Sequence, residues 1–310
     1  MLQYLLSRLF SALLVIFGVA VMVFLLIHLV PGDPVEVMLG ESASPVDREL
    51  LRQSLGLDQP IFTQFVNYIS ALAQFDAGNS IHSGRAISEI LAPRILPTLY
   101  LTLASLGVAM IIAFPLGILA AVYKDSWIDH LTMMVSLSGV SIPNFLMGPL
   151  LILLFSIYLG WLPVSGNEHS TSIILPAITL GSALAAILSR MIRASLLDVL
   201  GEDYIRTAKA KGLSAFVIVT HHALRNAMLP VLTIIGLQLG ALLGGAVITE
   251  MIFSWPGLGQ LTIESIQKRD YPVVQACILF ISSTYVIVNT VTDVLYAMLD
   301  PRIRLTGNNS

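Results

Sequence analysis

The stretch LFSALLVIFGVAVMVFLLIHLVPG, residues 9–32, contains no Asp, Glu, Lys or Arg. A helix needs about 20 apolar residues to cross the hydrocarbon core of a bilayer, and this stretch is long enough. Over the whole chain, charged residues make up only 11% and hydrophobic residues 56%. A soluble domain carries roughly 25% charged residues, so this chain has too few to cover a soluble core. The sequence therefore predicts an all-α integral membrane protein.

Five more charge-free stretches follow the first one, and together they predict six transmembrane helices in a single domain over residues 1–310. The charge-free stretches are 9–32, 95–123, 130–167, 169–189, 226–249 and 271–292. The predicted spans are 9–30, 96–123, 131–158, 172–193, 228–250 and 274–298. Pro143 lies inside the third span, where we expect a kink.

The Lys and Arg residues indicate how these spans are oriented, because short cytoplasmic loops are enriched in them. If the N-terminus is cytoplasmic, 10 of the 16 Lys and Arg residues fall in cytoplasmic segments. Four of the other six lie in one long loop, and long loops contribute little to the rule. We therefore expect both termini inside, segments 31–94 and 251–273 outside, and segment 194–227 inside.

The outer segment 31–94 is expected to be an ordered cap. Ser44 and Pro45 form the pattern of a helix N-cap followed by Pro at the first helical position. Four apolar residues share one face of a further predicted helix: Ile61, Phe65, Ile69 and Leu72. Such a face needs a surface to pack on, which favours a cap over the outer mouth. A plain connector is the alternative.

The inner segment 194–227 is expected to contain a short helix. Glu202 and Asp203 stand at its start and Lys209 and Lys211 at its end, which complements the helix dipole. Gly212 closes the helix in this prediction. A second short helix is expected over residues 214–223, separate from the fifth span. Charge placement of this kind also occurs in ordinary loops, so it does not assign a function alone.

Several kinds of catalytic and binding site have no counterpart in the sequence. It contains no GxxxxGK[ST] phosphate loop, no HExxH, no GxSxG and no CxxC. His221 and His222 are adjacent and diverge on a helix, so they do not form a metal site, and we expect no metal ligands and no catalytic residues. The net charge of −3 gives no basic surface for nucleic acid. The chain is predicted not to be an enzyme and to hold no cofactor.

Small and polar residues within the spans suggest packing and pathway positions. Gly236, Gly240 and Gly244 recur every four residues, a spacing that permits close helix contact in lipid. The pattern is equally compatible with two roles. One is packing within this chain, and the other is a subunit interface or a pathway-lining helix. The polar residues that the spans offer to a pathway include Asn144, Gln238 and Asn289.

Several motifs along the chain carry a family resemblance. They are MLQYLLSRL at 1–9, HLVPGDP at 28–34, LGLDQP at 55–60, GEDYIRTAKAKG at 201–212, LRNA at 224–227, FSWPGLG at 253–259, RDYP at 269–272 and DPRIR at 300–304. In this order they resemble the ABC-importer permeases of the dipeptide, oligopeptide and nickel type, specifically the "B" permease, and the glutathione-type permease is also similar. The resemblance extends from Met1 to about Leu305.

The resemblance implies a type I importer permease fold in the bacterial inner membrane. It also implies partners: a second, homologous C-type permease, two cytoplasmic ATP-binding subunits that bind ATP and Mg²⁺, and an extracytoplasmic solute-binding protein. The loop at 194–227 resembles the EAA loop, which docks on the ATPase. The general Glu-Ala-Ala sequence is replaced here by Arg206-Thr207-Ala208. The implied coupling residues are Glu202, Asp203, Tyr204, Arg206, Thr207, Ala208, Lys209, Ala210, Lys211 and Gly212.

The solute is left open by the sequence. Peptides are the main prediction, because the predicted spans offer mainly amides and hydroxyls, which suit a wide and weakly selective path. Glutathione and nickel or other metal chelates are the alternatives within the family. Outside it, the best rival is a self-sufficient secondary carrier, which should show intramembrane charge pairs and an internal repeat. A membrane-embedded enzyme is a third class, and it would need a nucleophile–base pair at membrane depth.

Overall fold

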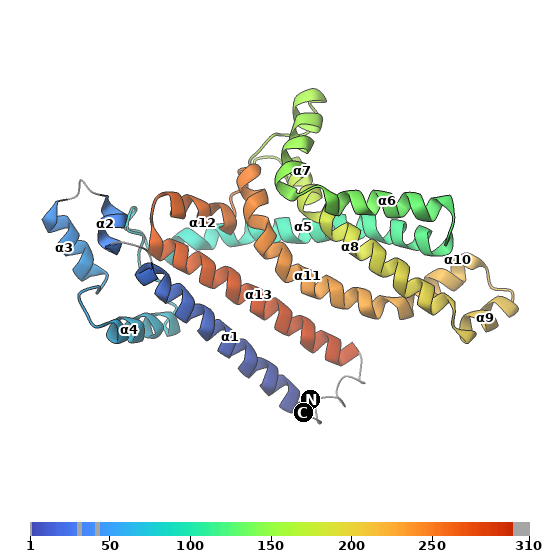
Figure 1. The fold of residues 1–310 in the computed structure, drawn as a ribbon, viewed down its shortest axis with the longest axis horizontal. Coiled ribbons are helices and arrows are strands. Elements are labelled where there is room, and N and C mark those ends of the chain that lie inside the picture. The colour runs from blue at the N-terminus through green and yellow to red at the C-terminus, as the bar shows by residue number, and fades with distance from the viewer. Residues whose placement is uncertain (1, 30–32, 41–43, 300–310) are drawn as a thin grey trace. The chain divides into compact units, whose positions relative to one another are not determined.

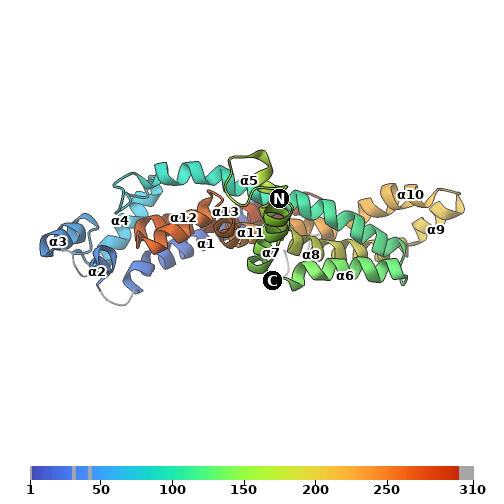
Figure 2. The same cartoon turned by 90° about the horizontal axis from the view of Figure 1, so that it is seen from above.

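The computed structural model describes residues 2–29, 33–40 and 44–299. These residues form helices, drawn from two directions in Figure 1 and Figure 2, and one isolated β-bridge between Asn79 and Ala86. The motif at 300–304 and residues 30–32 of the HLVPGDP motif lie outside the described residues. The α-helices are α1 (Leu2–Leu29), α2 (Pro34–Leu39), α3 (Pro45–Ser54), α4 (Ile61–Ala73), α5 (Ile87–Val122), α6 (Trp127–Ser141), α7 (Asn144–Leu151), α8 (Ile174–Leu200), α9 (Asp203–Ala210), α10 (Ala215–Val217), α11 (Leu224–Ile252), α12 (Leu258–Gln267) and α13 (Tyr271–Leu299). Two π-helical segments, Ile152–Tyr158 and Ile218–Ala223, and a 3₁₀ turn, Ser170–Ile173, complete the order.

Among the described residues, five helices are long and apolar enough to cross a membrane, or six if one bent pair counts as a span. That pair is α6 with α7 and the following π-helix, bent by 102°. The single kinked helix predicted over 131–158 is therefore a broken one. Ile142 is extended (φ −96°, ψ 114°) because it precedes a proline, and Pro143 then caps α7.

The inner segment also differs from the prediction. The helix expected at 214–223 is not separate from the fifth span, because α10, the π-helix and α11 follow one another without a break from Ala215 to Ile252. Ser214 caps its start by accepting a hydrogen bond from Val217 N–H at 3.4 Å. Pro230 lies inside α11 and does not end the helix.

The chain divides into two compact units. One contains Leu99–Trp255 and the end of α13 from Val288, and α8 lies in its core. Small residues bring neighbouring helices close to α8: a Cβ on Gly181 would lie 2.5 Å from the Ser105 carbonyl oxygen of α5. A Cβ on Gly139 of α6 would lie 2.7 Å from the Ser182 carbonyl oxygen. Larger side chains at these two glycines would push α5 and α6 away from α8.

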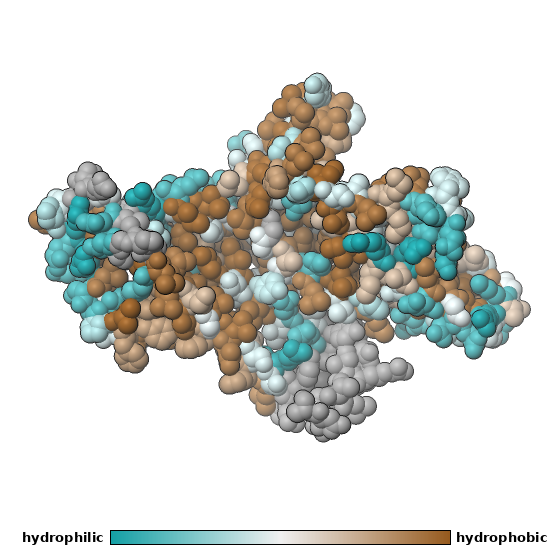
Figure 3. Space-filling view, in the orientation of Figure 1, coloured by the Kyte–Doolittle hydropathy of each residue, from teal (hydrophilic) through white to brown (hydrophobic). Residues whose placement is uncertain are grey.

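The exposed surface of this unit is apolar around α7. Large side chains on α7 and the adjoining π-helix are exposed, including Phe145 at 62% and Ile157 at 64%. The space-filling view shows the corresponding brown surface over α7 (Figure 3). Exposed apolar helices of this kind suit contact with lipid or with another membrane helix.

The other unit contains Leu2–Thr98 and Pro256–Ile287. The predicted N-cap is confirmed: Ser44 Oγ accepts from Asp47 N–H at 3.2 Å, and Pro45 begins α3. Phe65 of α4 packs edge-on against Phe24 of α1, with ring centroids 5.2 Å apart. The predicted apolar face of α4 is correct for Phe65, Ile69 and Leu72, which are half-buried, and wrong for Ile61, which is 55% exposed.

Tyr68 takes the place of Ile61 on the packed face of α4. Its ring lies 5.6 Å from that of Phe24, and burial raises the pKa of its phenol to about 12. Aromatic side chains pack this way because each buries a large apolar ring, and edge-on or tilted contacts between rings are favourable. The cap helix α4 is therefore held on α1 by a cluster of aromatic rings.

Candidate functional site

The candidate site is built around α9, the eight-residue helix that follows α8 in the inner segment. Ile205 is fully buried and Ala208 is 7% exposed, and both join the apolar core of their unit. These residues are three positions apart and therefore share one face of the helix. The remaining α9 residues are exposed. One face of α9 is thus anchored, and the opposite face is open to a partner.

The open face carries the charges that the sequence predicted for a coupling loop. Asp203 lies in the first turn and Lys209 in the last turn, in the order that complements the helix dipole. Arg206 Nη1 donates to Asp203 Oδ1 at 3.2 Å, but both side chains are more than 70% exposed. Such a pair contributes little to stability. These groups therefore lie where a second protein could reach them.

The end of α9 is closed by a left-handed glycine, as the sequence predicted. Gly212 has φ +80°, and its N–H donates to the Lys209 carbonyl oxygen at 3.0 Å. Leu213 N–H donates to the Ala208 carbonyl oxygen at 3.3 Å. The two bonds form a Schellman motif, which satisfies the last carbonyl groups of the helix. The chain direction after α9 thus depends on a backbone conformation that glycine adopts readily.

A hydrogen bond joins α9 to α11. Asn226 Nδ2 donates to the Tyr204 hydroxyl oxygen at 2.8 Å. Tyr204 was predicted as a coupling residue, whereas Asn226 and Ile205 were not. Ala208 was predicted as one, but it is buried in the core rather than exposed. The spacing of Ile205 and Ala208, with polar residues between them, was the available signal for the anchored face.

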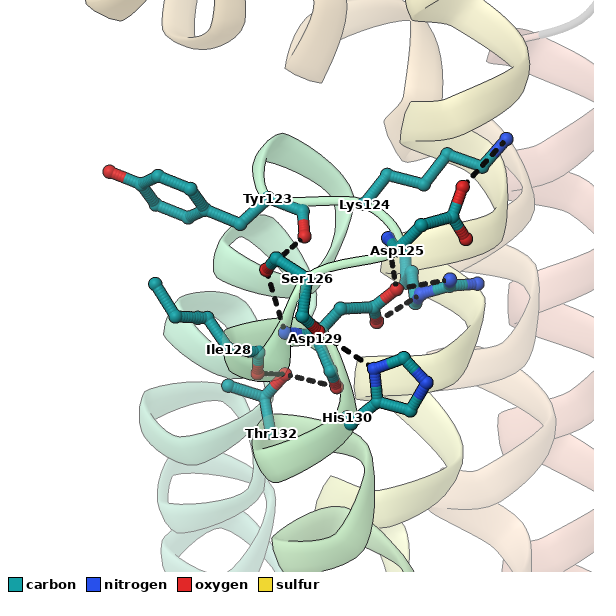
Figure 4. Close-up of polar contacts among 9 residues, drawn as sticks. Tyr123, Lys124, Asp125, Ser126, Ile128, Asp129, His130 and Thr132 are labelled. Atoms are coloured by element: carbon teal, nitrogen blue, oxygen red, sulfur yellow. Dashed lines mark hydrogen bonds and ion pairs between the residues drawn. The ribbon is translucent and has the colours of Figure 1, made fainter.

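An ion pair joins α6 to α8, the helix that precedes α9, and the sequence did not predict it. Arg193 of α8 donates from Nε to Asp129 Oδ1 at 2.7 Å and from Nη2 to Asp129 Oδ2 at 2.6 Å (Figure 4). Asp129, in the first turn of α6, is 4% exposed. Its Oδ2 also accepts from Asp125 N–H at 3.1 Å in the turn between α5 and α6. A bidentate pair of this kind fixes both the distance and the orientation of two helices.

Comparison with known proteins connects this geometry to a family. Residues 113–305 match the family described as the binding-protein-dependent transport system inner membrane component, and residues 1–89 match the N-terminal component of the same kind of system. The chain belongs to this family. It is therefore a permease subunit of an ABC importer and a multi-pass inner membrane protein, of the dipeptide, oligopeptide and nickel type that its motifs resemble.

Two relatives of this permease match it over nearly its whole length. The glutathione transport system permease protein GsiC of Escherichia coli strain K12 is 49% identical over 98% of this chain and 99% of its own. GsiC of Shigella flexneri serotype 5b is 48% identical over the same shares. Among solved structures, the inward-facing MetNI methionine ABC transporter matches 68% of this chain and 96% of its own, with a TM-score of 0.59 and 18% identity. That similarity supports the ABC-importer permease fold.

The glycines predicted to pack helices in the permease lie on α11 in different surroundings. A Cβ on Gly236 would collide with the side chain of Thr292 on α13, so the two helices approach closely there. Gly240 is also buried. Gly244 is exposed, and a Cβ there would meet nothing within 4 Å. Gly236 therefore serves contact within the chain, while Gly244 leaves room on the surface.

The three predicted pathway residues of the permease lie on three different helices. Asn144 begins α7, Gln238 lies in α11 and Asn289 in α13, and each is half-buried. In the described part of the chain, no hydrogen bond joins any two of them. The Oδ1 atom of Asn289 is buried without a hydrogen-bond partner. No cluster of three or more His, Cys, Asp or Glu side chains that could hold a metal ion occurs among the described residues.

Proposed function

We propose that this chain forms half of the translocation pathway of an ATP-driven importer for short peptides, which a binding protein delivers from outside. Its partners in this proposal are a second, C-type permease, two cytoplasmic ATP-binding subunits and that binding protein. Both termini and α9 face the cytoplasm, and the 31–94 cap faces outward. The main support is α9: a helix anchored through Ile205 and Ala208, with its charged face open.

The coupling step follows from how α9 is held. A partner ATPase that closes on ATP and Mg²⁺ pushes on the exposed face of α9. The buried face transfers this push to the core, because Ile205 has no space in which to move independently. The spans then shift between inward-open and outward-open arrangements. The proposed coupling residues are the exposed ones of the inner segment: Glu202, Asp203, Tyr204, Arg206, Thr207, Lys209, Ala210, Lys211 and Gly212.

Glutathione is the second candidate solute. The support for it is the 49% identity to a glutathione permease over nearly the full length of both chains. Glutathione is itself a short peptide, so the two candidates share amide and carboxylate groups and differ in linkage and size. The binding protein selects the solute in this scheme, and the permease needs only a path wide and polar enough to pass it.

Uptake by the complete importer tests the proposal. The permease would be produced with its partner permease, ATP-binding subunits and binding protein, and reconstituted into proteoliposomes containing ATP. Labelled dipeptide, tripeptide and glutathione would be offered separately and in competition. ATP-dependent uptake of at least one of them is expected, and complexes without the binding protein should show none. Uptake that continues without ATP-binding subunits would indicate a secondary carrier instead.

A further inference from the structure

The ion pair Asp129–Arg193 belongs to a longer line of contact between α6 and α8. One end of this line is the ion pair. Further along it, Ser189 Oγ of α8 donates to Ser136 Oγ of α6 at 2.8 Å, and both side chains are buried. Beyond that, Gly139 of α6 approaches the backbone of Ser182. Residue numbers rise along α6 while they fall along α8, so the helices run antiparallel. We call this line the α6–α8 seam.

The seam begins close to the coupling helix and ends close to the break in the third span. Arg193 lies about two turns before the end of α8 at Leu200, and α9 follows only Gly201 and Glu202 later. At the other end, Gly139 lies just before the break at Ile142 and Pro143, where α7 turns away by 102°. Gly148 of α7 in turn contacts Ile252 and Phe253 at the end of α11.

Of the three contacts that define the α6–α8 seam, the ion pair is the charged one. The Asp129 carboxylate accepts two bonds from Arg193 and one from Asp125 N–H. Asp125 has φ +60°, an uncommon conformation for a residue other than glycine. One carboxylate thus holds both the α5–α6 turn and α8. Because Asp129 is 4% exposed, removing its partner would leave a buried charge without compensation.

We propose that Asp129 and Arg193 are positioning residues for the coupling step: they lock α6 to α8, so that displacement of α9 moves both helices together and reaches α7. The proposal rests on the proposed function of α9. Without the lock, α8 would still move with α9, but α6 and the turn between α5 and α6 would not be displaced with them. ATP would then be hydrolysed without a matching change at the break in the third span. The pair therefore affects the efficiency of coupling more than assembly.

Charge reversal and exchange test this lock in the complete reconstituted importer. Arg193→Asp and Asp129→Arg alone should each lower the solute taken up per ATP by roughly tenfold or more, because each leaves two like charges facing each other. The double exchange should recover part of this loss, because it restores the ion pair but not the bond from Asp125 N–H, which an arginine side chain cannot accept. Arg193→Lys keeps the charge but loses the two-pronged geometry, so its uptake per ATP should be intermediate. Lys124→Glu is the control and should leave uptake per ATP unchanged, because the Lys124–Asp125 ion pair is exposed and long, at 3.9 Å, and contributes little.

Spin labels give a second measurement that does not depend on the solute. Cysteines would replace the exposed Asp198, near the end of α8, and the exposed Met134 on α6, after Cys277→Ala. In the otherwise unchanged complex, the distance distribution between the labels should remain narrow when ATP is added. In Arg193→Lys it should broaden or shift with ATP.

The outcomes separate the lock from the proposed function. A complex that takes up no peptide or glutathione contradicts the proposed solute class, while the label distances still decide whether α6 follows α8. Equal distributions in the unchanged and Arg193→Lys complexes overturn the lock. A double exchange that assembles but gives no more uptake per ATP than the single reversals overturns it too. If the single reversals do not assemble with the ATP-binding subunits, Arg193→Lys and the label distances decide alone.

Discussion

Replacing Gly212 with valine should uncouple ATP hydrolysis from uptake without removing the permease from the membrane. Gly212 has φ +80°, and a β-branched residue in this conformation costs on the order of 1–3 kcal/mol. A Cβ at this position meets no atom within 4 Å, so the cost is backbone strain rather than collision. A strain of this size shifts the equilibrium at the capped end of α9 by roughly 5- to 150-fold toward open conformations. It is too small to unfold the membrane spans.

A graded series separates strain from other effects of the substitution. Gly212→Asn should stay near wild-type activity, because Asn tolerates the left-handed region, and Gly212→Ala should fall between Asn and Val. Gly201→Ala is the positional control: Gly201 lies at the other end of the same loop with φ −78°. The assay is co-purification of the ATP-binding subunits, followed by solute uptake per ATP hydrolysed. Equal uptake per ATP in Gly212→Val and wild type would refute a coupling role for this turn.

Three further predictions concern the anchoring of α9, the packing of α11 and the orientation of the chain in the membrane. Ile205→Ala should destabilise the loop by roughly 2–5 kcal/mol, because the side chain is fully buried, and should reduce co-purification of the ATP-binding subunits. Gly236→Leu should lower the melting temperature of the purified permease in detergent, because Thr292 occupies the space, whereas Gly244→Leu should leave it unchanged. With Cys277 replaced, single cysteines at Phe75 and Phe216, which are 94% and 75% exposed, should react with impermeant reagents from opposite sides of the membrane.

The sequence predicts well those features that depend on neighbouring residues. A charge-free stretch of sufficient length predicts a spanning helix by its own composition. Such stretches lie within the five long apolar helices α1, α5, α8, α11 and α13. Ser44 and Gly212 were predictable for a similar reason. A helix cap is a bond between residues three or five positions apart, so its signal lies in a few consecutive letters.

Features that depend on distant residues were missed. Asp129 and Arg193 are 64 positions apart in the sequence. Taken separately, each residue indicates only a charge at the end of a membrane span. Their pairing follows only from the packing of α6 on α8. The size of the bend at Pro143 was missed for a comparable reason: proline excludes a straight helix, but the 102° turn depends on where α7 packs. The spacing of Ile205 and Ala208 indicates one apolar face of α9, but only the packing of the core beneath that face shows that it is buried.

The attachment of α9 determines what kind of motion the loop can transmit. Its start follows α8 after two residues, its Tyr204 hydroxyl accepts from Asn226 at the beginning of α11, and Ile205 lies in the core with both helices. A helix held at one point could rotate alone when a partner presses on it. A helix held at three points cannot, so pressure on α9 must move the ends of α8 and α11 as well. Since α6 is locked to α8 and α7 contacts the far end of α11, both routes lead to the break in the third span. The break, rather than α9 itself, is therefore the element whose angle should change most between the two arrangements of the permease.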